Sequence, residues 1–400
     1  MSTTKTELGA FPWHRSCPYR PPEQYEQVRS EGRPVRVELA TGGSAWLVTG
    51  YEQVREVLND RRLSSDRSHP GYPYFIPVPE QFKTNASFLG MDPPEHTVHR
   101  KMIAAEFTNR RVQRMRPRVE EIVDESLDAM LAKKPPVDLV QELSLPVPTA
   151  VIGALLGVPL EDHDFFYERT KMMMSGASSA EDRMTGLTEF EDYLRQLITD
   201  KRKNPGDDLL GKLVERYEEA GRYDHDQLTS MARLLLIAGH ETSANMISLG
   251  TMTLLKHPDQ LAELKRDPGL APNVAEELLR YLAVADLATS RIAMTDIEVG
   301  GELIREGEGI IAVTLSANRD EAAFDHADEL DVHRDAGGQV AFGYGLHHCV
   351  GADLTRLELE VVFGKLFQRV PGLRLDKPME ELPYKDGAVM YGVYEMPVTW

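Results

Sequence analysis

A short loop near the carboxyl end, AFGYGLHHCVG (Ala341–Gly351), contains one of only two cysteines among 400 residues. Glycines surround Cys349, and the pattern from Val350 onward is helical. A sulfur at a helix start faces unpaired backbone N–H groups and the positive end of the helix dipole, which favour thiolate over thiol. Glycine permits positive φ angles and lets a flat ligand approach the backbone closely. We therefore expect this loop to present a thiolate to a ligand.

Cys349 by itself allows three other interpretations. A single cysteine is commonly a small buried hydrophobe. Zinc binding is disfavoured because His347, His348 and Cys349 are too crowded to act together, and no second ligand pair follows at the usual spacing. A nucleophilic cysteine is the third interpretation, but no signature of such a site surrounds it.

A second candidate lies in the apolar stretch from Leu228 to Pro258, which predicts one long buried helix. Its centre reads AGHET. Glycine inside a helix costs about 1 kcal/mol relative to alanine, and burying Glu241 costs more unless it is paired or touches water. Thr242 stands four residues after Ala238 and can donate a hydrogen bond back to that carbonyl. These residues predict a groove where a small molecule and a proton path meet, with a solvated polar patch as the alternative.

The third stretch is VAEELLRYL (Val274–Leu282). Glu277 and Arg280 are three residues apart, so they share one face of the predicted helix and can pair. Taken alone, this pattern indicates a surface ion pair worth about 0 to 1 kcal/mol.

The elements that must position these residues are mostly helices. Apolar residues at helical spacing predict helices over residues 119–131, 194–198 and 354–366. Two hairpins are predicted, one pairing residues 35–39 with 45–48 and one within 296–315 around Gly300 and Gly301. There is no repeat, no obvious linker and no strand–helix alternation. The sequence predicts a mainly α protein with small β-sheets and a single large domain.

Composition excludes several classes of function. Lys plus Arg number 45 and Asp plus Glu 64, which gives a net charge of -19. This acidity disfavours nucleic acid and anionic membranes, because binding to either depends on Lys and Arg. The amino-terminal segment lacks an apolar signal-peptide core, and no apolar run approaches the roughly 18 residues of a membrane span. Two cysteines do not make a disulfide scaffold. We expect an acidic cytoplasmic protein.

Together the three stretches resemble the cytochrome P450 family of haem-thiolate monooxygenases. The cysteine loop fits the family pattern F-x-x-G-x-H-x-C-x-G, AGHET fits [AG]-G-x-[DE]-T, and ELLR fits E-x-x-R, in the same order along the chain. The similarity includes DPPEHTVHR (92–100) and ANRD (317–320). The soluble bacterial class is more similar, because the microsomal class has an amino-terminal membrane helix. The resemblance implies a P450 domain over residues 12–400, after a flexible tail over residues 1–11.

The resemblance also implies the reaction. The chain would be an oxidoreductase that incorporates oxygen from O2 and hydroxylates or epoxidises a hydrophobic small molecule, such as a natural product or a xenobiotic. The implied cofactor is haem b (iron protoporphyrin IX), with Cys349 as the axial ligand of its iron. Glu241 and Thr242 correspond to the catalytic residues that relay protons and hold dioxygen.

Further positions match the family residue by residue. Glu277, Arg280 and Arg334 correspond to a buried structural network, which replaces the surface-pair interpretation. The remaining cofactor-binding residues implied are His96, Arg100, Arg291 and His347 for the haem propionates, together with Ala238, Phe342 and Gly351. The implied substrate pocket comprises segments 71–90, 170–179, 284–290 and 387–392, represented by Leu89, Met173, Ala238, Leu287 and Val389.

Electron supply is the last implication. No flavin or nicotinamide fingerprint occurs, so electrons would come from NAD(P)H through ferredoxin reductase and ferredoxin. The segment FTNRRVQRMRPR (Phe107–Arg118) has five arginines, and the resemblance places it on the cysteine side of the haem. It is a candidate dock for an acidic ferredoxin, with a solvated basic helix face as the alternative. We expect a monomer with no nucleic-acid or membrane partner.

Two other functions stay open at this stage. A haem protein that senses or carries electrons needs neither Glu241 and Thr242 nor an apolar pocket. A helical interaction protein without a cofactor would be colourless when purified.

Overall fold

The computed structural model describes residues 8–400 except 18–19, 79–82, 84–86, 175–177 and 387. Contacts within the chain divide it into two compact units. The first comprises Met1–His96, Asn273–Cys349 and Tyr384–Gly392, and the second comprises Thr97–Pro272, Val350–Pro383 and Val393–Trp400.

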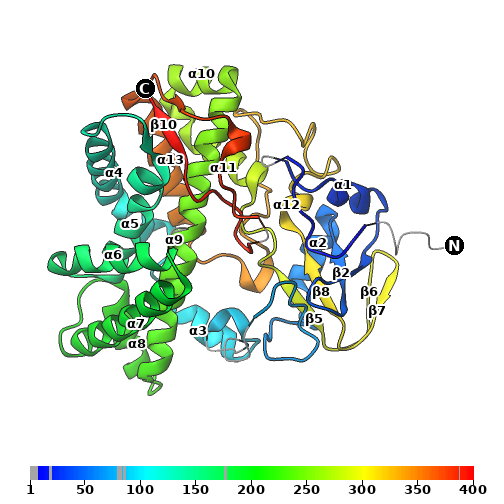
Figure 1. Ribbon diagram of the computed structural model, residues 1–400. Helices are drawn as coiled ribbons and strands as arrows, with labels where there is room; N and C mark the ends of the chain where they lie inside the picture. Colours follow the sequence, from blue (N-terminus) through cyan, green and yellow to red (C-terminus); the bar gives the residue numbers. More distant parts are fainter. Residues whose placement is uncertain (1–7, 18–19, 79–82, 84–86, 175–177, 387) are drawn as a thin grey trace. The chain divides into compact units, whose positions relative to one another are not determined.

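The first unit contains most of the β-structure (Figure 1). Its elements are α1 (Glu23–Ser30), β1 (Val35–Glu38), β2 (Ser44–Val48), α2 (Tyr51–Asn59), β3 (Leu63–Ser64), η2 (Phe88–Gly90), most of α11 (Ala271–Leu282), β5 (Ser290–Ala293), β6 (Ile297–Val299), β7 (Glu302–Ile304), β8 (Gly309–Ala312), α12 (Thr314–Ala317) and η6 (Gly345–His347).

A five-stranded sheet in the order β1-β2-β8-β5-β3 forms its centre. Strands β1 and β2 form the first predicted hairpin, with Val35 opposite Leu47. Alternate β1 residues are buried, as expected for a strand with one face on a core. Strands β6 and β7 form the second hairpin around Gly300 and Gly301. Strand β8 is not part of that hairpin, because it pairs in parallel with β2 and antiparallel with β5.

The second unit is mainly helical. Its elements are α3 (Glu95–Ala104, the first two residues of which belong to the first unit), α4 (Asn109–Leu131), β4 (Val137–Asp138), η3 (Val140–Ser144), α5 (Pro146–Leu156), η4 (Leu160–Asp162), α6 (His163–Met174), α7 (Ala180–Lys203), α8 (Leu209–Glu219), α9 (His225–Lys256), α10 (Pro258–Arg266), η5 (Pro268–Leu270), α13 (Ala352–Arg369), β9 (Arg374–Leu375), η7 (Met379–Glu381) and β10 (Pro397–Thr399).

Helix α9 is the axis of this unit (Figure 1). It packs against α5, α7 and α13, and α13 also packs against α4. Every residue from Ser243 to Leu254 is buried, so the second half of the helix has no solvent-facing stripe. The predicted long helix is therefore present; it ends at Lys256, and Pro258 starts α10. The helices expected within 119–131, 194–198 and 354–366 lie in α4, α7 and α13.

Two boundaries differ from the sequence-based expectation. Helix α13 begins at Ala352 rather than Val350, because Gly351 is its N-cap. Phe11, which was assigned to the flexible tail, is fully buried and forms a β-bridge with Leu39. Residues 1–7 lie outside the described part of the chain.

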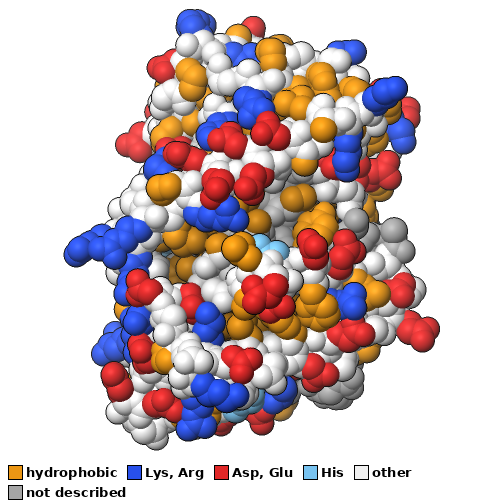
Figure 2. All heavy atoms as spheres, turned by 90° about the vertical axis from the view of Figure 1, so that its left-hand side faces the viewer, with side chains coloured by type: hydrophobic (Ala, Val, Ile, Leu, Met, Phe, Trp, Pro, Cys, Tyr) orange, Lys and Arg blue, Asp and Glu red, His pale blue; other side chains and the backbone are white. Residues whose placement is uncertain are grey.

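Acidic and basic side chains are interspersed over the face of the molecule shown in Figure 2. Many of the described charged residues form ion pairs, so the net charge of -19 does not produce a uniformly acidic surface on that face. Among the described residues, no helix is long and apolar enough to cross a membrane.

Candidate functional site

Cys349 lies in the first unit, between η6 and the start of α13, and its side chain is exposed. Its backbone N–H donates to the Phe342 carbonyl oxygen at 2.8 Å, which closes the loop. Gly343 and Gly345 both have a φ of +71°, in the left-handed region that favours glycine. The loop therefore turns at two glycines and closes on Phe342, and the Cys349 side chain is exposed.

Helix α2 supports this loop from one side. A Cβ at Gly345 would lie 2.6 Å from the Leu58 carbonyl oxygen, so only glycine permits this close approach. Arg55 Nη2 also donates to Tyr344 Oη at 3.0 Å, with the guanidinium 4.6 Å from the ring centroid. The sequence did not identify Arg55 or Tyr344, because no pattern links residues so far apart in the chain.

Two of the expected carboxylate-binding histidines lie in contact. The ring centroids of His96 and His347 are 4.1 Å apart. Ser65 Oγ lies 3.1 Å from His347 Nε2 and contributes to this cluster. His348 instead lies edge-on to Phe342, with ring centroids 6.3 Å apart. The two adjacent histidines therefore have different surroundings.

Arg291, on β5 of the same unit, is 7% exposed. Nη1 donates to the Ser290 carbonyl oxygen at 2.8 Å. Burial lowers the pKa of Arg291, and Tyr72 and Asp92 oppose that effect. Among the described residues, no carboxylate lies within ion-pair distance of this guanidinium. Because a buried cation requires an anionic partner, its surroundings fit an acidic group of a ligand.

Arg100 follows His96 by four residues on α3, and its side chain is half-buried. The i, i+4 spacing places both residues on one face of the helix. His96 belongs to the first unit and Arg100 to the second.

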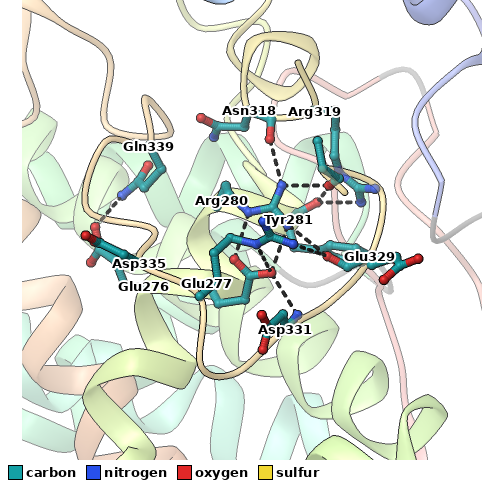
Figure 3. A network of polar contacts seen from close by, with 12 residues as sticks. Glu276, Glu277, Arg280, Tyr281, Asn318, Arg319, Glu329, Asp331, Asp335 and Gln339 are labelled. Carbon is teal, nitrogen blue, oxygen red and sulfur yellow. Dashed lines mark hydrogen bonds and ion pairs between the residues drawn. The ribbon is translucent and has the colours of Figure 1, made fainter. Parts of the chain in front are cut away.

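Glu277 and Arg280 are the buried centre of a polar network in the first unit (Figure 3), and the half-buried Arg334 also binds Glu277. Arg280 binds the Glu277 carboxylate through Nε and Nη2, at 2.7 and 2.8 Å, and both side chains are fully buried. Arg334 Nε and the Asp331 backbone N–H donate to Glu277 Oε1 at 3.2 and 3.0 Å. The interpretation of Glu277 and Arg280 as a surface ion pair is therefore wrong.

The ANRD motif takes part in the same network. Arg280 Nη1 donates to the Asn318 carbonyl oxygen at 2.7 Å, and Asn318 Oδ1 accepts from the Val340 N–H at 2.8 Å. Arg319 is 3% exposed and donates through Nη2 to the Tyr281 carbonyl oxygen at 2.9 Å. The sequence analysis included the ANRD motif in the family resemblance. It could not predict these hydrogen bonds, because their partners are distant in the sequence.

The AGHET segment lies in the middle of α9, in the second unit. Thr242 Oγ1 donates to the Ala238 carbonyl oxygen at 2.6 Å, as its spacing predicts, and the helix continues without a break. Glu241 is half-buried, while Ala238 and the neighbouring Ile237 are exposed. An exposed apolar patch flanked by buried turns fits a ligand-facing surface.

Sequence reasoning missed a buried acid next to this segment. Glu358, on α13, is 3% exposed and faces Ser243 of α9. Burial raises the pKa of Glu358 to about 8, and the hydroxyl of Ser243 partly offsets the shift. The spacing of apolar residues predicted the helix that contains Glu358, but it did not indicate that the Glu358 side chain is buried.

The expected pocket residues are distributed over both units. Leu287 is buried in an apolar cluster of the first unit, and Val389 packs against that cluster. Leu89, also in the first unit, is half-buried. Met173 is half-buried in the second unit, which also contains Ala238. Residues 79–82, 84–86, 175–177 and 387 of the expected pocket segments lie outside the described residues.

A further charged group lies beside Leu287. Asp286 is 4% exposed, and Tyr25 Oη donates to its Oδ2 at 3.5 Å. Burial raises the pKa of Asp286 to about 6, and the nearby Arg15 opposes this effect. The guanidinium of Arg15 lies 3.7 Å from the ring centroid of Tyr391.

The arginine-rich segment at the start of α4 is only partly available to a partner. Arg111 pairs with Glu106 at 2.6 Å, Arg116 with Glu360 at 2.8 Å, and Arg118 with Glu121 at 2.5 Å. Arg110 and Arg114 are exposed, as is Lys101 on α3, and none of the three forms an ion pair with a described residue. The five-arginine surface expected from the sequence is thus reduced to two arginines and a lysine.

These groups define a class of protein. The first unit has an accessible thiol beside two left-handed glycines, a histidine pair and a buried arginine without a carboxylate partner. Such donors fit a flat group that carries both a thiolate-binding metal and carboxylates, which describes haem. Among the described residues, no group of three or more His, Cys, Asp or Glu could hold a metal ion.

Comparison with known proteins agrees with this class. The family model described as Cytochrome P450 matches residues 6–204 and 269–379. The chain belongs to the cytochrome P450 family, whose cofactor is haem bound through a cysteine thiolate. It has the P450 fold and is a monooxygenase that acts with substrate, O2 and redox partners.

Individual relatives cover nearly the whole chain. It is 50% identical to pentalenic acid synthase of Streptomyces avermitilis, over 98% of this chain and 97% of that protein. It is 48% identical to vitamin D3 dihydroxylase of Streptomyces griseolus, over 99% of this chain and 98% of that protein. The crystal structure of cytochrome P450 MoxA from Nonomuraea recticatena is similar with a TM-score of 0.94, 49% identity and 98% coverage of both chains.

Proposed function

We propose that this cytochrome P450 hydroxylates a hydrophobic natural product with haem b as its cofactor. The observation that carries this proposal is the cysteine loop, in which left-handed Gly343 and Gly345 leave the Cys349 thiol accessible. The names of its relatives, pentalenic acid synthase and vitamin D3 dihydroxylase, favour a small and largely apolar substrate. Exposed Ile237 and the apolar surroundings of Leu287 and Val389 favour the same class.

Four residues would hold the carboxylates of the haem. Arg291 supplies a buried cation, and His96 and His347 supply adjacent imidazoles. Arg100 would bind a propionate from α3. Cys349 would ligate the iron, with Ala238, Phe342 and Gly351 beside the ring. When bound, haem supplies an electron-rich iron at which O2 is reduced.

Thr242 and Glu241 would hold and relay protons. The hydroxyl hydrogen of Thr242 is donated to the Ala238 carbonyl, which leaves the Oγ1 lone pairs free to accept from water. Glu241 is half-buried and therefore in reach of water, so its carboxylate can take a proton from water and pass it on toward Oγ1. Glu277, Arg280 and Arg334 would act structurally by fixing the chain that precedes the cysteine loop.

We propose ferredoxin as the electron donor, docking on Lys101, Arg110 and Arg114. These cations are exposed and form no ion pair with a described residue, so they remain available for an acidic partner. Glutamate at Arg110 and Arg114 should lower the ferredoxin-dependent rate and weaken its dependence on salt. Glutamate at Arg118, which pairs with Glu121, is the control. We also propose that the protein is a monomer in the cytoplasm, a reducing compartment that suits a chain with only two cysteines.

The spectrum of the reduced protein with carbon monoxide tests the proposed cofactor and ligand. A long-wavelength Soret band that disappears in Cys349→Ala is expected for a thiolate ligand. An imidazole-type band, or an unchanged band in the variant, would overturn the assignment. A panel of terpenoids, steroids and macrolides, screened for a shift of the haem spin state, then identifies the substrate class.

A further inference from the structure

A buried histidine joins three helices of the second unit. His99 of α3 is 4% exposed, and its Nδ1 lies 2.5 Å from Tyr217 Oη of α8. Its other ring nitrogen, Nε2, lies 3.0 Å from the side-chain nitrogen of Gln227, in the first turn of α9. The rings of His99 and Tyr217 are stacked, with centroids 5.7 Å apart and planes 16° apart.

The partners of His99 determine where its proton lies. The amide nitrogen of Gln227 only donates, so Nε2 accepts and the ring hydrogen lies on Nδ1. Nδ1–H then donates to Tyr217 Oη. The hydroxyl hydrogen of Tyr217 points to Met231 Sδ, 4.0 Å away on α9. In this arrangement each of these hydrogens has an acceptor.

Helix α8 holds α3 at a second point. Arg216, next to Tyr217, donates to the Met102 carbonyl oxygen at 2.6 Å and pairs with Glu106. Glu106 is 5% exposed and also binds Arg111 of α4 at 2.6 Å. Consecutive residues of α8 therefore contact α3 and the segment that follows it, which fixes both the position and the rotation of α3.

We propose that His99 is a positioning residue that sets the direction in which Arg100 projects from α3. Adjacent residues of a helix point about 100° apart, so locking one ring fixes the direction of its neighbour. His99 is bonded at both nitrogens, to Tyr217 and Gln227, and its ring also stacks on Tyr217, which leaves α3 little freedom to rotate. This inference depends on the proposed role of Arg100 in binding a haem propionate.

A set of variants separates positioning from packing. His99→Leu keeps an apolar side chain of similar size and removes both bonds, whereas Tyr217→Phe removes one hydroxyl. His99→Asn retains a hydrogen-bond donor near the position of Nδ1 and should therefore keep the haem-binding properties that His99→Leu loses. Tyr223→Phe is the matched control, because Tyr223 Oη bonds His225 Nδ1 at 3.1 Å beside the same end of α9 and forms no described bond with α3.

The rate of haem transfer to apomyoglobin and the reduction potential are measured in each holoenzyme. We expect haem loss about tenfold faster in His99→Leu and about threefold faster in Tyr217→Phe. His99→Asn and Tyr223→Phe should stay near the wild-type rate. Adding Arg100→Ala to His99→Leu should give less than the sum of the single effects, since both act through one side chain.

Different failures identify different errors. Unchanged haem loss in Arg100→Ala overturns the proposed role of Arg100, and with it the route from His99. If Arg100→Ala speeds haem loss but His99→Leu has no effect, or an effect that simply adds to that of Arg100→Ala, the positioning role of His99 is overturned and the role of Arg100 stands. Nitrogen-15 NMR of the histidines provides a readout that does not use activity. A ring hydrogen on Nε2 of His99, rather than Nδ1, would contradict the proposed arrangement even if a variant fails to fold.

Discussion

The carboxylate of Glu277 receives two parallel hydrogen bonds from the guanidinium of Arg280, at 2.7 and 2.8 Å, and water reaches neither side chain. The remaining capacity of the carboxylate is used by Arg334 and by the Asp331 N–H. A buried ion pair costs much desolvation energy and is tolerated only when its other hydrogen bonds are also made. Here they are made, so this network should fix one conformation of the chain before the cysteine loop.

Glu277→Gln should therefore be strongly destabilising. It leaves the buried Arg280 and the half-buried Arg334 facing a neutral amide, and breaking a buried pair costs about 3–5 kcal/mol of the free energy of unfolding. Urea unfolding followed by circular dichroism measures the change. Glu121→Gln is the matched control, because Glu121 pairs with Arg118 at the same spacing but is 58% exposed. Its loss should be about 0–1 kcal/mol, and equal losses in the two variants would contradict the structural role.

Gly343 and Gly345 allow backbone strain to be separated from steric clash. Both have a φ of +71°. A Cβ at Gly343 meets nothing closer than 3.9 Å, whereas a Cβ at Gly345 would lie 2.6 Å from the Leu58 carbonyl oxygen. Gly343→Ala should cost about 1–2 kcal/mol through φ alone, and Gly345→Ala should also displace the loop from α2. We expect the carbon monoxide difference spectrum to retain most of its thiolate band in the first variant and little in the second.

Glu358 predicts a pH dependence of stability. Its pKa is raised from 4.5 to about 8 by burial, against the opposing effect of Ser243. Between these two values the folded protein keeps a proton that the unfolded chain has lost. The free energy of unfolding therefore falls as pH rises through this window, by at most about 1.4 kcal/mol per pH unit. Glu358→Gln removes this contribution, so the variant should gain stability over the wild type between pH 5 and 8.

The opposite sign is expected at Glu308. Burial tends to raise its pKa, but hydrogen bonds from the Arg305 N–H and the Trp46 ring outweigh burial and lower it. The stability from such a group is present above the unfolded pKa and lost as pH falls. Glu308→Gln should therefore lose stability relative to the wild type at neutral pH but not in acid. If the free energies of unfolding of Glu358→Gln and Glu308→Gln changed with pH in the same way, the assignment of the raised pKa to Glu358 would be refuted.

Thr242 provides a test of proton handling. Thr242→Ala removes the hydroxyl that donates to the Ala238 carbonyl, and α9 should remain intact because alanine is a good helix former. We expect unchanged haem content, more hydrogen peroxide per reductant consumed, and product formation lower by about 10²-fold, as for loss of a general acid–base group. Thr242→Ser keeps the hydroxyl and should remain coupled. Equal coupling in the alanine variant and the wild type would exclude the proposed role.

Local patterns in the sequence predicted the elements that carry the site. The spacing of apolar residues predicted the long helix α9 and the helix that carries Glu277 and Arg280. Alternating residues around a glycine turn predicted the hairpin of β1 and β2. The resemblance implied one contact between distant segments, that of Glu277 with Arg334. Other such contacts could not be predicted, because the residue pattern alone carries no information on which side chains meet. Arg55 with Tyr344 and His99 with Tyr217 are such contacts. The arginine-rich segment illustrates the same limit, since the partner of Arg116 is Glu360 of α13.

Asp286, within the expected pocket segment 284–290, offers a final test. Burial raises its pKa from 3.8 to about 6, while Arg15 and the hydroxyl of Tyr25 lower it. Removing either opposing group should therefore raise the pKa of Asp286 further. Carbon-13 NMR of labelled aspartate, assigned with Asp286→Asn, follows the titration. We expect an upward shift in Arg15→Gln and a smaller one in Tyr25→Phe, with none in Arg20→Gln; a downward shift in Arg15→Gln would show that Arg15 does not stabilise the charged form.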